Sequence, residues 1–331
     1  MLLATPAPVA AQATISTGSI QGTILDQQGA VVSSAKVTIT NKAIGQKIRP
    51  VVTSTGTYNS GALLPGDYVV RVEATGFRTL ELPVTVLVGV ISSGNVTLQV
   101  GSEATVVTVE SSAVQVNTEQ AAVQGVMDLA QLEPGVQIQD GGNFDPTKNG
   151  FSSISFAGRF GRTARIEVDG IDISDETVGT TTQNIPQVAI KEFQISQSTL
   201  DLSTELTSSG AVNVVTHSGT NSFHGEGFFY GRSDQISARF APKQLDFGRK
   251  QYGVRFGGPF IKEKLFFLGA WERTQQDLAA PVTLSKPFDV LTGNFNSPFR
   301  DNQFLGRLDY QIKPGWTVFY RFSYEQNRNV S

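Results

Sequence analysis

The sequence predicts a mainly β protein built of three successive parts. Short alternating runs fill the N-terminal third, separated by Gly and Pro turns at a spacing of about 8–12 residues. In the C-terminal third, strands of about ten residues have one apolar and one charged face, with the two-residue period of extended chain. The composition agrees, because 33 Gly and 21 Phe suit extended structure with frequent turns.

The composition also excludes several kinds of chemistry. The 331-residue chain has no cysteine, which excludes a disulfide framework, a thiolate nucleophile and a Cys-ligated metal centre. Charged residues make up 17% and the net charge is −3, so no basic field indicates nucleic acid as a partner. We therefore predict no catalytic, cofactor-binding or metal-binding residues and no enzyme activity.

Two groups of polar residues are candidate sites. His217 and His224 are the only histidines, and we favour polar strand or turn positions over a metal site or a triad. A calcium site or an acid–base pair is conceivable at an acidic cluster, but the spacing fits no EF-hand loop. We favour a solvated hairpin and loop, because charged runs are usually solvated. The cluster consists of Glu167, Asp169, Asp172, Asp175 and Glu176.

The N-terminus carries a small-residue cleavage pattern. Residues 1–13 read MLLATPAPVAAQA and end in Ala11-Gln12-Ala13, an A-x-A pattern typical of exported proteins. We predict residues 1–15 to be the remnant of a signal peptide, with a disordered Ala/Pro-rich terminus as the alternative.

Residues 16–101 are expected to form a β-sandwich, because their short strands are regularly spaced between turn signals. The expected strands are Ser19–Leu25, Lys36–Thr40, Gly56–Ser60, Asp67–Glu73, Leu80–Val86 and Asn95–Val100.

This stretch resembles the carboxypeptidase regulatory-like family in the order and spacing of its motifs. The resemblance implies a transthyretin-like sandwich. That fold is often described as carbohydrate-binding-like, but no aromatic platform in the sequence supports a sugar site. The matching runs include Gly18-Ser19-Ile20-Gln21-Gly22-Thr23, Ala35-Lys36-Val37-Thr38-Ile39, Leu64-Pro65-Gly66-Asp67-Tyr68 and Glu73-Ala74-Thr75-Gly76-Phe77.

In residues 221–331, two strands have the clearest separation of faces. Leu305 and Phe319 are the exceptions on otherwise polar faces. No window holds the ~18 apolar residues of a membrane helix, so strands of this kind indicate a membrane β-barrel. The apolar faces are Phe304, Gly306, Leu308, Tyr310 and Ile312 in Gln303–Ile312, and Trp316, Val318, Tyr320, Phe322 and Tyr324 in Trp316–Glu325.

Three earlier strands are expected, and the orientation of the last is ambiguous because Leu265–Trp271 is apolar on both faces. With five strands the barrel is incomplete, since closed membrane barrels have at least ~8, and we expect a truncated copy of a larger protein. Connections should alternate between long and short, as in outer-membrane barrels. The strands are Ser222–Arg232, Gln251–Gly258 and Leu265–Gln275, and the connections are Ser233–Lys250, Pro259–Lys264, Gln276–Asn302 and Lys313-Pro314-Gly315.

Between these parts, residues 102–220 are expected to form an α+β domain. A helix is predicted over Gln120–Leu132, followed by a loop over Gln139–Gly150. Strands Ser153–Ala157 and Arg165–Val168 then lead into the turn dipeptide Asp169-Gly170.

Three blocks of this domain, in order, resemble the plug of TonB-dependent receptors. They are Phe151–Arg159 with Ile166–Ile171, then Ile190–Ile195, then Ser209–Thr216. The sequence departs from this family in one respect. Plugs of the family usually have a longer stretch before the Pro-Gly-Val triplet, whereas here only 24 residues separate Val109 from Pro134. Either the plug lacks a helix–strand unit or the copy is degenerate.

Two runs of the C-terminal part resemble Oar-like TonB-dependent receptors, Phe256–Phe267 and Asn302–Tyr310. In addition, Thr105, Val106, Val107, Thr108 and Val109 resemble the TonB box, which an energising TonB-type protein captures by strand addition. A further sandwich strand or a linker is the alternative for these five residues.

Together the resemblances imply a TonB-dependent receptor or transporter in the outer membrane, with its N-terminal domain in the periplasm. They imply outer-membrane lipid as a partner, and an unidentified small molecule, oligosaccharide or peptide as ligand. The alternative is a surface or adhesion β-protein whose sandwich binds carbohydrate or protein.

Overall fold

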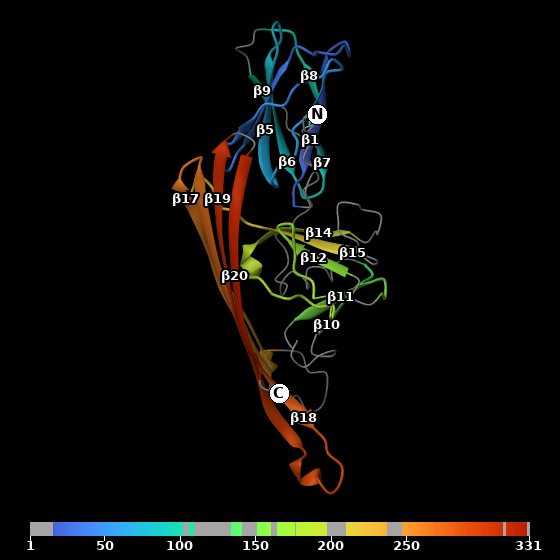
Figure 1. The fold of residues 1–331 in the computed structure, drawn as a ribbon, viewed down its shortest axis with the longest axis vertical. Coiled ribbons are helices and arrows are strands. Elements are labelled where there is room, and N and C mark those ends of the chain that lie inside the picture. Colours follow the sequence, from blue (N-terminus) through green and yellow to red (C-terminus); the bar gives the residue numbers. More distant parts are fainter. Residues whose placement is uncertain are drawn as a thin grey trace, which may run out of the picture.

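A computed structural model gives the fold as strands throughout, with only three short 3₁₀ turns among the described residues (Figure 1). None of the described helical turns has the length and apolarity needed to cross a membrane. The residues described are 16–101, 106–108, 134–140, 151–159, 164–175, 177–196, 210–236, 247–313 and 316–329.

The N-terminal part is the predicted sandwich, made of two sheets. Every predicted strand is present to within two residues, and β3, β7 and β9 are additional. One sheet has the order β4(Thr57–Asn59)-β1(Ser19–Asp26)-β7(Ile91–Ser93), with β8(Val96–Leu98) also on β1; the other is β3(Lys47–Ile48)-β2(Lys36–Asn41)-β5(Gly66–Glu73)-β6(Thr79–Val86)-β9(Val106–Thr108).

Alternation along the strands places the sandwich core between the sheets. In β5, Tyr68, Val70 and Val72 are buried while their neighbours are not, as the period of two requires. The Tyr58 hydroxyl donates to the Gly94 carbonyl at 2.6 Å. A Cβ at Gly94 would lie 2.3 Å from that hydroxyl, so glycine is required for this close approach.

The middle part consists of a hairpin and a four-stranded sheet. The hairpin is β10(Val136–Asp140)-β11(Ser152–Phe156), and the sheet is β13(Ile171–Asp172)-β12(Ala164–Val168)-β15(Gly210–Thr216)-β14(Ile190–Ser196). β12 and β15 run parallel at its centre. All seven residues of β15 are buried, as is typical of parallel sheets, whose two faces are both covered. The helix predicted over 120–132 lies outside the described residues. The start of the predicted 139–150 loop belongs to β10.

The C-terminal part is one antiparallel sheet of five long strands in chain order, which confirms the predicted strands. Figure 1 shows it as a curved wall with the plug-like sheet against its concave side and the sandwich at one end. The strands are β16(His224–Ser233), β17(Phe247–Ile261), β18(Leu265–Val282), β19(Gly293–Lys313) and β20(Trp316–Asn329).

The plug-like domain explains two irregularities in the apolar pattern of the wall, the apolar inner face of β18 and Leu305. Phe266, Leu268 and Ala270 are at most 5% exposed, so the even-numbered residues of β18 face inward. Leu305 is fully buried and joins Leu268 and Ala270 in one core with plug residues such as Val212. Leu268, Ala270 and Leu305 are therefore apolar on the inner face because the plug's own core touches the wall there.

The prediction of a long loop over Gln276–Asn302 was wrong, because β18 and β19 continue as a paired hairpin to Val282 and Gly293. Arg300 holds the extension together: it bonds the Asp277 carboxylate at 2.6 Å and the Gln276 carbonyl at 2.7 Å. The apolar–polar alternation stops here, but backbone pairing needs no such pattern.

Replacing Tyr58 with Phe should lower the free energy of unfolding of the sandwich by about 1–3 kcal/mol, because the buried Gly94 carbonyl loses its donor. Chemical denaturation followed by circular dichroism measures this. Val51→Ala, at an 85% exposed position, should change it by less than about 0.5 kcal/mol. Equal effects of the two changes would contradict the assigned role of Tyr58.

Candidate functional site: the polar interface between plug and barrel

The site begins at the tight turn after β12. Asp169 and Gly170 both have positive φ, 50° and 79°, a conformation that Asp tolerates better than most residues. The Asp169 N–H donates to the Val214 carbonyl at 2.8 Å, which ties the turn to the central strand β15. The carboxylate is thereby held at the face of the plug that meets the barrel.

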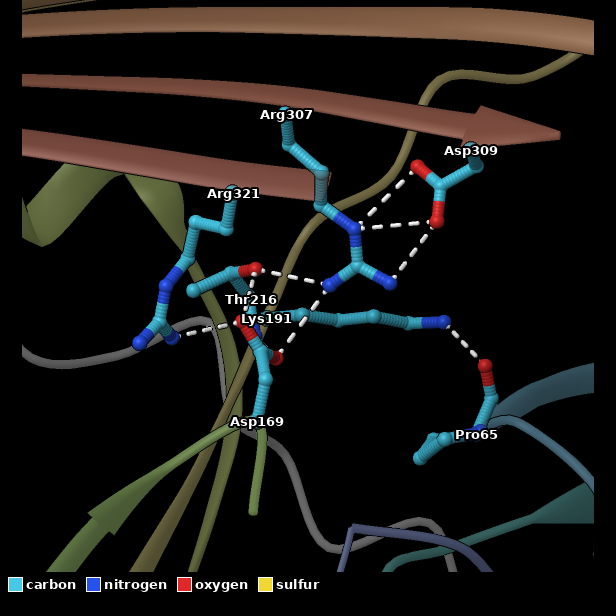
Figure 2. A network of polar contacts seen from close by, with 7 residues as sticks. All are labelled: Pro65, Asp169, Lys191, Thr216, Arg307, Asp309 and Arg321. Atoms are coloured by element: carbon cyan, nitrogen blue, oxygen red, sulfur yellow. Dashed lines mark hydrogen bonds and ion pairs between the residues drawn. The ribbon is translucent and has the colours of Figure 1, made fainter. Parts of the chain in front are cut away.

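The Asp169 carboxylate accepts four hydrogen bonds in this position (Figure 2). Two come from the plug itself, from the Thr216 N–H and the Thr216 hydroxyl, each at 2.8 Å. The other two come from the barrel wall, from Arg321 at 2.8 Å and Arg307 at 3.2 Å. All three charged side chains are at most 8% exposed, so this is a buried ion-pair network joining two domains.

Arg307 is the centre of the barrel side of the network. It makes three contacts of 2.9–3.1 Å with Asp309, two residues along the same strand face. It also donates to the Thr216 hydroxyl at 2.9 Å. The Phe319 ring lies under its guanidinium, 4.5 Å from ring centroid to Cζ, so this aromatic exception in β20 covers a buried cation.

A second group of polar contacts fixes the segment around the 3₁₀ turn η4(Gln187–Ala189). Glu272 of β18 accepts from the Gln187 N–H at 2.6 Å and from Gln251 at 2.6 Å. Glu325 of β20 accepts from the backbone and side-chain amides of Asn184, at 2.6 and 2.9 Å. Barrel carboxylates thus satisfy plug backbone donors that would otherwise be buried without partners.

The sandwich is attached to the same region through β14. The Lys191 ammonium donates to the Pro65 carbonyl of the sandwich, and Glu192 accepts from the Val88 N–H at 3.0 Å. Burial lowers the pKa of Lys191 and raises that of Glu192. The Asn221 N–H, just before β16, donates to the Ala43 carbonyl at 2.9 Å. Sandwich, plug and barrel therefore meet within one small region.

The structure corrects the interpretation of the acidic cluster as a solvated hairpin and loop. Glu167 and Asp169 are 3% and 7% exposed, because the parallel strand β15 and the barrel cover the turn. Asp172 pairs with Arg165, and Asp175 caps the Thr177 N–H at 2.9 Å. Glu176 lies outside the described residues. No acidic or histidine group in the described part of the chain could hold a metal ion.

The two histidines occupy turn and strand positions. His217 follows β15, and its N–H donates to the Ala189 carbonyl at 2.8 Å. Burial lowers the pKa of His217 to about 3, and the nearby cations Arg255, Lys191 and Arg307 add to the effect. His224 is exposed at the start of β16.

The predicted TonB-box-like segment is described only at its centre. Val106–Thr108 forms β9, which pairs in parallel with β6 through Thr79, Leu80 and Glu81. This is the placement that the alternative, a further sandwich strand, also expects, so the box stays a prediction.

Sequence reasoning did not identify the partners of Asp169. From the sequence alone, Arg307, Asp309 and Arg321 are simply residues of the polar faces of their strands, and Thr216 belongs to a run that resembles a plug motif. The sequence did contain one usable signal, the Arg-x-Asp pair Arg307 and Asp309 on the polar face of its strand. If a domain covers that face, the buried charges need hydrogen-bond partners from the domain.

Two family models match this chain. One, described as an outer membrane beta barrel domain, matches residues 215–299. The other, a carboxypeptidase regulatory-like domain, matches residues 19–109. With the five-stranded wall and the plug-like domain, these matches define an outer-membrane β-barrel protein that carries a regulatory-like sandwich.

The chain is 25% identical to the TonB-dependent transporter Oar of Myxococcus xanthus, over 91% of this chain and 33% of that protein. It therefore spans about a third of the length of this relative. Over that third, the chain resembles this TonB-dependent transporter.

Solved structures of similar proteins include a siderophore receptor and an outer membrane transporter. The siderophore receptor PirA from Acinetobacter baumannii has a TM-score of 0.43 and 17% identity, over 63% of this chain and 34% of that one. The outer membrane transporter YddB from Escherichia coli has a TM-score of 0.44 and 11% identity, over 62% and 31%. Since both TM-scores are below 0.5, the fold assignment stands on the strands of this chain.

Asp169→Asn should lower the free energy of unfolding by about 3–5 kcal/mol, because it leaves Arg307 and Arg321 buried with less compensating charge. Denaturant titration of the detergent-solubilised chain measures the change. Asp277→Asn is the matched control: it breaks the exposed pair with Arg300 and should cost no more than about 1 kcal/mol. A cost for Asp169→Asn as small as that of the control would contradict the network's role.

The contribution of His217 to stability should be lost as the pH drops from about 6.5 towards 3. The pKa of His217 is lower in the folded chain than in the unfolded chain, so the unfolded state binds more protons in this range. We expect a loss of about 1–2 kcal/mol at pH 5, measured by denaturant titration across pH. His217→Gln should remove this component and His224→Gln should leave it. An identical pH dependence in the two variants would contradict the assignment.

Proposed function

We propose that this chain takes part in TonB-dependent transport of a solute across the outer membrane, with the Asp169 network holding the plug-like domain in its resting position. The observation that carries the proposal is the buried network itself: one plug carboxylate bonded to two arginines of the barrel wall.

The chemistry of this interface suits a domain that must move. Buried ion pairs gain little net stability over apolar contacts, because desolvation of the charges offsets their attraction. Water can replace each partner once the domains separate, since every group involved is polar. The polar contacts at Glu272 and Glu325 have the same property. An interface of this kind is specific in register and can be opened by an applied force.

The segment Thr105–Val109 is the proposed point of attachment for the energising protein. Its described part, β9, is the last strand of its sheet, and an edge strand presents free backbone groups to which another strand can add. Force applied there would act on the sandwich, which contacts the plug strand β14 through Pro65 and Val88.

The adhesion alternative has less support. The aromatic rings of the described sandwich are Tyr58 and Tyr68, each 2% exposed, and Phe77, which packs on the core. Sugar-binding surfaces rely on exposed rings of this type. The exposed hydrophobic residues of the described sandwich are aliphatic.

A single introduced cysteine tests plug movement, because the chain has none of its own. Ala189→Cys places a thiol at a fully buried position between the plug and the wall. In cells with an active TonB system, this thiol should react with a periplasmic maleimide several-fold faster than in cells treated with a protonophore. Val107→Pro should abolish the difference, because Pro removes a strand N–H, whereas Val107→Thr should preserve it.

Two further cysteines serve as controls for the labelling. Ile171→Cys, 53% exposed, should react at the same rate in both states, and Val37→Cys, 2% exposed in the sandwich core, should stay protected. Equal labelling of the Ala189 position with and without energy would overturn the proposal, and reaction at position 37 would indicate general unfolding instead.

A further inference from the structure

The outward face of the barrel wall carries a polar feature that the plug does not touch. Glu272 and Asp301 are each 4% exposed, and Glu272 accepts a hydrogen bond from the plug, so they mark the inner face of β18 and β19. Because successive residues of a strand point to opposite faces, Arg273 and Arg300 point outward. Lys250 of β17 is also outward, since its neighbour Gln251 is buried.

Strand pairing arranges the outward residues in rows across the wall. One row is apolar and aromatic: Val254, Trp271, Phe304 and Tyr324. Next, further from the sandwich, is the row Tyr252, Arg273, Asn302 and Gln326. After it follows the row Lys250, Gln275, Arg300 and Arg328. We call Lys250, Arg273, Arg300 and Arg328 the basic belt.

The belt lies at the height of lipid headgroups. The outward residues of β19 are apolar or glycine from Phe304 to Ile312, a span of about 27 Å along the strand. With a strand tilt of about 40°, this is roughly 21 Å across the membrane, close to the ~25 Å apolar band of outer-membrane barrels. The belt begins one row beyond Phe304, where the hydrocarbon layer ends.

Three of the four charges of the belt have no carboxylate partner among the described residues. Arg300 and Arg328 are directly opposite each other on adjacent strands, an arrangement that is unfavourable without an anion. Asp277 pairs with Arg300 at 2.6 Å, and no carboxylate of the described residues pairs with Lys250, Arg273 or Arg328. Four cations and one carboxylate leave the belt with a net charge of +3.

We propose that the basic belt binds the phosphate groups of an anionic lipid in the leaflet at the hairpin end of the wall. This inference rests on the proposed location of the wall in the outer membrane. Guanidinium groups bind phosphate in bidentate geometry. The belt borders the row of Trp271 and Tyr324, so one lipid touches apolar rings with its acyl chains while its phosphates reach the arginines. Free phosphate would contact the arginines but not the apolar rings.

The two tryptophans lie at opposite ends of the apolar band and allow each end to be probed separately. Trp271 is next to the belt, and Trp316 is at the opposite end of the strands. The full chain, with Trp316→Phe or Trp271→Phe, is reconstituted in phosphatidylcholine vesicles whose brominated acyl chains quench tryptophan fluorescence. Unbrominated diphosphoryl lipid A is then added as the probe.

Enrichment of lipid A at the belt should relieve the quenching of Trp271 at lower lipid A content than that of Trp316. The triple variant Lys250→Gln, Arg273→Gln, Arg328→Gln should raise the lipid A content for half-recovery at least about tenfold, because each basic residue near an anionic surface contributes roughly a fivefold affinity. The matched control Lys262→Gln, Lys264→Gln, Lys313→Gln should leave the Trp271 response unchanged. Dephosphorylated lipid A should give no enrichment, and excess inorganic phosphate should not displace the lipid.

Each contrary outcome has a defined meaning. Equal recovery at the two tryptophans, equal effects of the two triple variants, or recovery that does not depend on the phosphates would overturn the basic belt as a lipid site. Displacement by inorganic phosphate would assign the belt to free anions. If brominated chains quench neither tryptophan, the wall does not face hydrocarbon, and the proposed function fails together with this inference.

Discussion

The arrangement of the described residues depends on burying the charge of Asp169 between two domains. A buried carboxylate is tolerated only if it is paired and fully hydrogen-bonded, and Thr216, Arg307 and Arg321 meet that requirement together. Their positions fix the register of the plug against the wall, because a shift of one residue in β19 or β20 would turn each arginine to the opposite face. Asp309 and the Phe319 ring in turn hold Arg307.

The interface combines this network with a small apolar contact, and the two have different roles. Leu268, Ala270 and Leu305 extend the plug core into the wall. Their burial stabilises the contact but does not depend on orientation. The polar groups fix how the plug is oriented against the wall, because each hydrogen bond requires a particular atom at a particular angle. The sandwich also contacts the plug near this interface, through Lys191 and Glu192 of β14.

Much of this fold could be predicted from the sequence, because alternation and turn residues are local signals. The faces of β19 and β20 and the core positions of β5 are examples. The extension of β18 and β19 past Gln276 could not be read, because its pairing involves backbone groups and the Arg300–Asp277 pair, which leave no periodic pattern. The site itself was visible only in part: the Asp169-Gly170 turn was recognised, but its contact with Arg307 spans 138 residues, and no local pattern reports a contact at that separation.

The position of β15 in its sheet has a mechanical consequence. β15 is one of the two central strands of the plug-like sheet, paired to β12 in parallel and to β14 in antiparallel orientation. A force applied to the sandwich would reach the plug-like sheet at β14 and pass to β15. From there it would reach the wall through Thr216 and Asp169. Pulling across such a sheet loads its interstrand bonds in sequence, whereas pulling along a strand loads them in parallel. The direction in which a tether is drawn would therefore decide whether this sheet peels open strand by strand or detaches as one rigid piece.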